Sequence, residues 1–163
     1  MKQTQNLKVT TPTDREILIT RAFDAPRKLV FEAYTKPELV KRWLLGPPGW
    51  TMPVCEIDLK VGGAYRYVWE KQGTKMGMGG IYKEIKAPER LVCTERFDES
   101  WYPGEAVDTL VLTEQGGKTT LNMTVRYESQ EARDTALKSN MEEGMAAGFD
   151  RLADLLASQA KGK

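Results

Sequence analysis

Carboxylates are the side chains best suited to acid–base chemistry in this sequence, because its 163 residues include no histidine. That absence removes the commonest general base, the commonest metal ligand and every serine–histidine or cysteine–histidine nucleophile pair. A carboxyl group facing the interior would have a raised pKa and could act as an acid or base. The carboxylates in or beside predicted strands are Glu56, Asp58, Glu84, Glu95 and Asp98. We expect most of them on the solvated face.

Glu84 is the carboxylate that we single out. Period-2 alternation places it on the same face of its strand as Tyr82. An enzyme of the cyclase or hydrolase kind would use these two residues. Since no nucleophile and base are paired in the sequence, we assign no catalytic residue and expect a non-catalytic protein.

Aromatic and methionine side chains form a second set with a regular spacing. Tyr65, Tyr67 and Trp69 alternate along one face of a predicted strand, and three rings in line are costly to expose. Apolar surroundings with a few polar tips are typical of small-molecule pockets. The predicted ligand-binding residues are Trp43, Tyr65, Tyr67, Trp69, Met78, Tyr82, Glu84, Met141, Met145 and Phe149. The alternative is that these side chains simply fill a core.

Glycines mark three further places. The Gly-rich run 77–80 lies inside a predicted strand rather than between a strand and a helix, which excludes a nucleotide-binding loop. Residues 46–50, with two glycines and two prolines, form either a rigid lip at a pocket mouth or a plain connector. Gly144 and Gly148 share a helix face and indicate either close packing or space for a ligand.

The spacing of apolar residues predicts the elements that position these side chains. A polar lead-in covers residues 1–14, and two short helices lie between the first and second strands. The final segment, capped by Ser129 and running to about Ala157, predicts one helix of about 28 residues, or about 42 Å. The seven predicted strands cover residues 16–23, 54–61, 64–71, 76–85, 91–97, 107–113 and 119–127. Their short turns require antiparallel pairing.

Composition excludes several classes of function. Twenty-four basic and 23 acidic residues leave a net charge of +1, so we expect no nucleic-acid partner. No apolar stretch is long enough to span a bilayer, and the polar first 13 residues do not form a secretory leader. Cys55 and Cys93 lack metal-ligand spacing, and we expect reduced core thiols rather than a disulfide. We predict a cytoplasmic protein without metal or cofactor, either monomeric or homodimeric.

Several motifs in order along the chain point to one family. They are Phe23-Asp24-Ala25-Pro26, residues 30–33, 35–38 and 42–43, Val61-Gly62-Gly63, residues 80–85, 88–92 and 141–144, and residues 151–156. Together they resemble the activator-of-heat-shock-protein-90-ATPase homologue family, part of the START-like (SRPBCC) superfamily, over about residues 16–157. The resemblance implies an α+β helix-grip fold: one domain over 1–163 with an ordered core at about 16–157. It also implies a pocket between the sheet and the last helix.

Two positions depart from the family pattern. Family members often have Trp-Trp-Gly-Pro where this chain has Trp43-Leu44-Leu45-Gly46-Pro47, and often a Trp where it has Met145. Both changes would alter the pocket wall, so the resemblance carries over no ligand. The superfamily has no universal catalytic motif, and fold alone does not make an enzyme.

Three functions follow as expectations. The first is binding or transport of a small hydrophobic molecule, which requires an enclosed apolar space of about 300 Å³ or more. The second is a stress-response interaction module with chaperone contact. The third is the enzyme described above.

Overall fold

The computed structural model describes residues 7–99, 102, 104–139 and 141–161, and these contain eight strands and four helices. The strands are β1 (Lys8–Thr10), β2 (Glu16–Phe23), β3 (Thr51–Ile57), β4 (Ala64–Lys71), β5 (Thr74–Lys86), β6 (Arg90–Phe97), β7 (Ala106–Gln115) and β8 (Lys118–Arg126). The helices are α1 (Arg27–Thr35), α2 (Pro37–Trp43), α3 (Gln130–Leu137) and α4 (Met141–Lys161).

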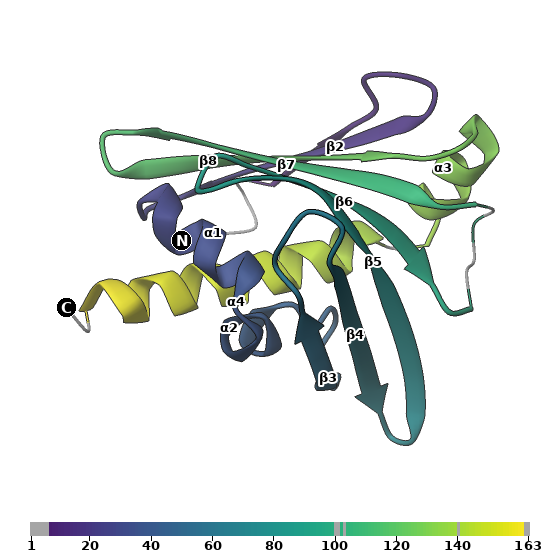
Figure 1. Ribbon diagram of the computed structural model, residues 1–163, viewed down its shortest axis with the longest axis horizontal. Coiled ribbons are helices and arrows are strands. Elements are labelled where there is room, and N and C mark those ends of the chain that lie inside the picture. Colours follow the sequence, from purple (N-terminus) through teal and green to yellow (C-terminus); the bar gives the residue numbers. More distant parts are fainter. Residues whose placement is uncertain (1–6, 100–101, 103, 140, 162–163) are drawn as a thin grey trace.

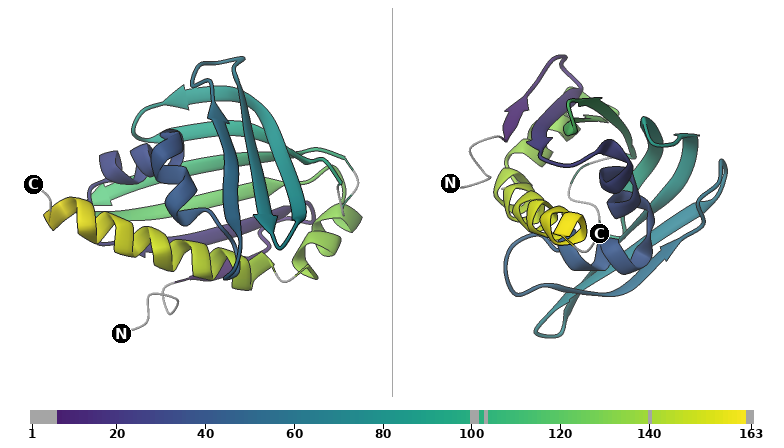
Figure 2. Two further views of the ribbon diagram at one scale, coloured as in Figure 1. Left: turned by 90° about the horizontal axis from the view of Figure 1, so that it is seen from below. Right: turned by 90° about the vertical axis from the view of Figure 1, so that its left-hand side faces the viewer.

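The eight strands form one antiparallel sheet in the order β1-β2-β8-β7-β6-β5-β4-β3. Strands β3 to β8 pair with their neighbours in sequence, and β2 joins the sheet by pairing with β8 along its whole length. The sheet bends around α4, and α1 and α2 lie beside that helix (Figure 1; Figure 2). The predicted α+β helix-grip architecture is confirmed.

The strand count and the position of β3 differ from prediction, and the other strand boundaries differ by two residues or fewer. The polar lead-in contains β1, which pairs with Leu18–Thr20 of β2, so the sheet has eight strands rather than seven. A strand of three residues is too short to show period-2 alternation. Strand β3 begins and ends earlier than predicted, at Thr51 and Ile57, and contains Pro53 at the edge of the sheet, where proline is tolerated.

The predicted single C-terminal helix is two helices. Ser129 caps α3 as expected, accepting a hydrogen bond from the Ala132 backbone N–H at 3.1 Å. At the other end, the backbone N–H and hydroxyl of Ser139 both donate to the Ala136 carbonyl, at 3.1 and 2.6 Å. Such local serine bonds compete with continuation of a helix. Helix α4 is therefore 21 residues long, or about 32 Å.

A buried ion pair joins the first long strand to α4. Arg21 lies on the inner face of β2 and is fully buried, with its Nη1 3.4 Å from Oδ1 of Asp150. Its guanidinium carbon also lies 5.0 Å from the centre of the Phe23 ring. The packing of α4 against the sheet therefore includes a specific polar contact. Within the described part of the chain, no helix combines the length and apolar character required to cross a bilayer.

Candidate functional site

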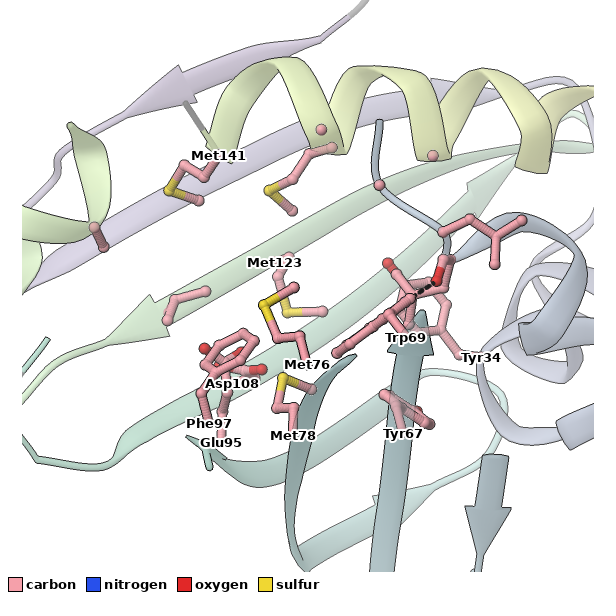
Figure 3. A pocket seen from close by; sticks show the side chains of 18 of the residues that line it. Tyr34, Tyr67, Trp69, Met76, Met78, Glu95, Phe97, Asp108, Met123 and Met141 are labelled. Carbon is pink, nitrogen blue, oxygen red and sulfur yellow. Dashed lines mark hydrogen bonds between the residues drawn. The ribbon is translucent and has the colours of Figure 1, made fainter. Parts of the chain in front are cut away.

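A cavity of about 690 Å³ lies between the sheet and α4. Its walls come from the inner faces of β4 to β8, the C-terminal end of α2 with the following loop, and the N-terminal half of α4. Nine of the ten predicted ligand-binding residues line it, and only Glu84 does not. They are Trp43, Tyr65, Tyr67, Trp69, Met78, Tyr82, Met141, Met145 and Phe149. Figure 3 shows how several of these side chains converge.

The rings of β4 lie inward as their alternation predicts. Tyr65, Tyr67 and Trp69 are all buried, and their ring centroids are 5.1 and 5.9 Å apart in succession. The Tyr65 hydroxyl donates to the Thr94 carbonyl at 2.6 Å, and the Trp69 indole N–H donates to the Leu44 carbonyl at 2.7 Å. The polar tips of these two rings therefore hold the protein wall in place.

The lip and the helix glycines lie on the opposite wall. Within residues 44–50, Leu44, Leu45, Gly46, Pro47 and Trp50 line the cavity. Arg151 donates to the Gly46 carbonyl at 2.7 Å, which ties this loop to α4. A Cβ at Gly148 would lie 3.4 Å from the Trp43 carbonyl, so close packing, here against α2 rather than the sheet, explains this glycine.

The predicted inward orientation of Glu84 is wrong. The register of β5 against β6 shifts between Tyr82 and Glu84, which marks a β-bulge and breaks the period-2 alternation. Tyr82 is buried in the cavity wall, whereas Glu84 is exposed and accepts a hydrogen bond from Arg90 Nε at 2.9 Å. The residue pair that the enzyme interpretation requires is therefore not assembled.

Three other carboxyl groups line the cavity, and they are Glu95 on β6, Asp108 on β7 and Glu143 on α4. Glu95 and Asp108 lie close together beside Phe97 in Figure 3, with Met76 and Met78 between them and Trp69. The Tyr102 hydroxyl donates to Glu95 Oε2 at 2.8 Å. Asp108 is buried, and its Oδ1 has no hydrogen-bond partner among the described residues.

The surroundings determine the protonation of Asp108. Burial raises its pKa well above the ordinary range, and the negative charge of Glu95 and a hydrogen bond with Glu95 raise it further. Asp108 therefore stays protonated, and its O–H donates a hydrogen bond to Glu95. The two carboxyl groups together carry one negative charge.

The thiols and tyrosines of the cavity are neutral. Both cysteines are free, as predicted, and Cys93 lines the cavity. Burial raises the pKa of the Cys93 thiol and, more modestly, that of Cys55 to about 11. Burial also raises the pKa of Tyr67 and of Tyr82. None of these groups is an activated nucleophile or base at neutral pH.

A family model described as "Activator of Hsp90 ATPase homolog 1-like protein" matches residues 24–157. The match covers α1, α2, every strand from β3 to β8, α3 and most of α4. The chain belongs to this family. Among curated proteins, none matches it.

Solved structures similar to this member of the Hsp90-activator-like family cover nearly the whole chain. A Rhodobacter sphaeroides protein is 31% identical with a TM-score of 0.88, over 94% of this chain and 99% of its own. One from Chromobacterium violaceum is 28% identical with a TM-score of 0.78, over 88% of this chain and 98% of its own. An HSP90 activator from Plasmodium falciparum, 19% identical with a TM-score of 0.58 over 80% and 91%, shares the fold alone.

Proposed function

We propose that this protein binds a small hydrophobic molecule in the cavity between the sheet and α4. The observation that supports the proposal is the volume of about 690 Å³ enclosed mainly by aromatic, aliphatic and methionine side chains. Small-molecule sites have volumes of about 300–1,000 Å³ and walls of this composition. The methionines that line it supply apolar surfaces that adapt to irregular ligands, and they are Met76, Met78, Met123, Met141 and Met145.

Native mass spectrometry of protein purified from its source, together with displacement of a fluorescent hydrophobic probe, tests this proposal. We expect one bound small molecule per chain, or saturable binding of one probe. Met145→Trp, which fills the cavity from α4, should weaken probe binding about 10-fold or more, the effect of losing about 1.4 kcal/mol. Ala157→Trp adds the same ring at an exposed position of the same helix and is the control. Equal binding by both variants would place the probe elsewhere.

Membership in the Hsp90-activator-like family supports chaperone contact as a second candidate function. An exposed apolar surface is present on the side away from α4. Val61 and Ile81 are 66% and 44% exposed. Their segments are joined by hydrogen bonds from the Gly62 N–H to the Tyr82 carbonyl and from the Tyr82 N–H to the Gly63 carbonyl. Exposed apolar side chains in a group are typical of protein-binding surfaces.

A pull-down with the middle domain of Hsp90 across a range of salt concentrations tests the second candidate. Binding at micromolar protein that Val61→Asp abolishes, and that Met145→Trp leaves intact, would support it. Absence of binding at that concentration would exclude it without affecting the ligand proposal.

A further inference from the structure

One end of the cavity is polar in an otherwise apolar space. Glu95 and Asp108 project into it from adjacent strands, and Cys93 rather than Glu95 is the direct cross-strand neighbour of Asp108. The two carboxyl groups therefore meet on the diagonal of the β6–β7 pair and share a hydrogen bond. The Tyr102 hydroxyl satisfies the outer oxygen of Glu95.

Asp108 keeps one acceptor that no other described residue uses. The residue is 9% exposed, and its Oδ1 is buried without a hydrogen-bond partner in the described part of the chain. An unsatisfied buried acceptor costs about 1–3 kcal/mol, which a donor on a ligand would recover. A ligand that binds here should therefore present an N–H or O–H group to Asp108 Oδ1.

The charges around the cavity distinguish between these donors. Among the described residues that line it, Glu95, Asp108 and Glu143 are acidic and none is lysine or arginine. Aromatic rings surround the acidic end, since Tyr102 lies 6.2 Å from Phe97 and 5.1 Å from Tyr127 between ring centroids. Ring faces attract cations, and a partly buried negative charge such as that of Glu95 repels anions.

We propose that the cavity takes a hydrophobic amine, whose ammonium group donates a hydrogen bond to Asp108 Oδ1 and neutralises the charge of the Glu95–Asp108 pair. This inference rests on the proposed function and adds the chemical class of the ligand. Fatty acids and other hydrophobic anions fit the cavity less well, because none of the described residues that line it is a lysine or arginine that could pair with them. A metal ion is a poorer occupant, because no group of three or more Cys, Asp or Glu side chains in the described residues is placed to hold one.

Three probes with one ring system and different head groups test the inference by calorimetry at pH 7. They are 2-(1-naphthyl)ethylamine, 2-(1-naphthyl)ethanol and 1-naphthylacetate. A hydrogen bond to a charged group is worth about 1.5–3 kcal/mol, so the amine should bind about 10- to 100-fold more tightly than the alcohol. The carboxylate should bind most weakly.

Glu95→Gln keeps the shape of the side chain and removes the charge of the pair, because Asp108 is protonated and the charge lies on Glu95. It should reduce amine affinity to about that of the alcohol and leave alcohol affinity unchanged. Asp154→Asn also replaces a carboxylate by an amide, at an exposed position of α4, and should leave all three affinities unchanged. Asp108→Asn leaves the charge of Glu95 and an amide oxygen in place, so it should keep the preference for the amine. If Glu95→Gln does not fold, the preference of the unmodified protein still tests the inference.

Equal affinity for amine and alcohol, tighter binding of the carboxylate, or an amine preference that survives Glu95→Gln would each overturn the inference while leaving the cavity as a binding site. Failure of all three probes, together with failure of a larger hydrophobic probe, would instead overturn the proposed function and this inference with it.

Discussion

At the scale of single residues, two buried ionisable groups distinguish this interior from a purely apolar one. Asp108 lies at the cavity wall with Glu95 as its partner, and Arg21 lies between β2 and α4 with Asp150 as its partner. Burial raises the pKa of Asp108 and lowers that of Arg21, so in both cases it favours the neutral form. The two sites differ in what the partner does, because Glu95 adds a like charge and Asp150 an opposite one.

The stability of the protein should depend on pH through Asp108. Its folded-state pKa is raised, so its favourable contribution is complete below the unfolded pKa of about 3.9 and is lost as the pH rises toward the folded value. Asparagine does not titrate. In urea unfolding, the free energy of unfolding of Asp108→Asn relative to that of the unmodified protein should therefore increase between pH 4 and pH 8. The expected increase is about 1 kcal/mol or more. A difference that stays constant with pH would contradict this.

Removing the partner of Arg21 should be costly. Asp150→Asn takes away the carboxylate that offsets the desolvation of a fully buried guanidinium, and we expect a loss of about 3 kcal/mol in the free energy of unfolding. Asp154→Asn, one turn further along α4 and exposed, is the matched control and should change stability by less than about 0.5 kcal/mol. Equal effects from the two variants in urea unfolding would mean that the pair does not stabilise the fold.

Strand alternation predicted the cavity rings, and the same signal was available for the acidic pair. Asp108 alternates with Ala106, Leu110 and Leu112, all buried. A carboxylate in phase with three apolar residues indicates an inward group. The same alternation predicted the wrong orientation for Glu84, because a β-bulge shifts the register after Tyr82. Such a bulge depends on the pairing between strands.

At the scale of elements, α4 and the loop at residues 44–50 together form the wall opposite the sheet. Trp69 and Arg151 each donate to a carbonyl of this loop, at Leu44 and Gly46. The loop is thereby attached to β4 on one side and to α4 on the other. We expect it to keep one position, whereas a role as a gate would require both bonds to break.

The glycine at position 144 offers a stabilising change. A Cβ there would lie 3.5 Å from Pro47 Cδ and 3.9 Å from Gly46 Cα, both ordinary contact distances. Gly144→Ala should therefore raise the free energy of unfolding by about 0.5–1 kcal/mol through the helix preference of alanine. Thermal unfolding measures the effect, and a lower melting temperature would show that the loop does not tolerate a methyl group.

Most helices and strands could be predicted from the sequence because each is long enough for its apolar residues to repeat several times. The two short helices and the strands from β4 to β8 each contain several apolar residues in phase. Strand β1 has too few residues for a period, and the end of α3 depends on the hydrogen bonds of Ser139. The helix stripe from Leu137 to Met141 continues across the break, so apolar spacing alone does not show it.

At the scale of the whole molecule, a helix lies across a bent sheet (Figure 2), and a cavity lies between the two. The sheet bends around α4, and Met145 lines the cavity from that helix. The general location of the cavity was predictable from the fold. Its volume and its acidic end were not, because they depend on how side chains from five strands and four helices meet.

Methionine methyl NMR tests the central claim, that this space holds a small hydrophobic molecule, most directly. With 13C-methyl methionine labelling, titration with a naphthyl probe should shift the signals of Met76, Met78, Met123, Met141 and Met145, which line the cavity. Met52 is buried outside the cavity lining and should stay in place as an internal control. Saturable shifts confined to the five cavity methyl groups are the predicted result. Probe binding that leaves all five signals unmoved would contradict the account.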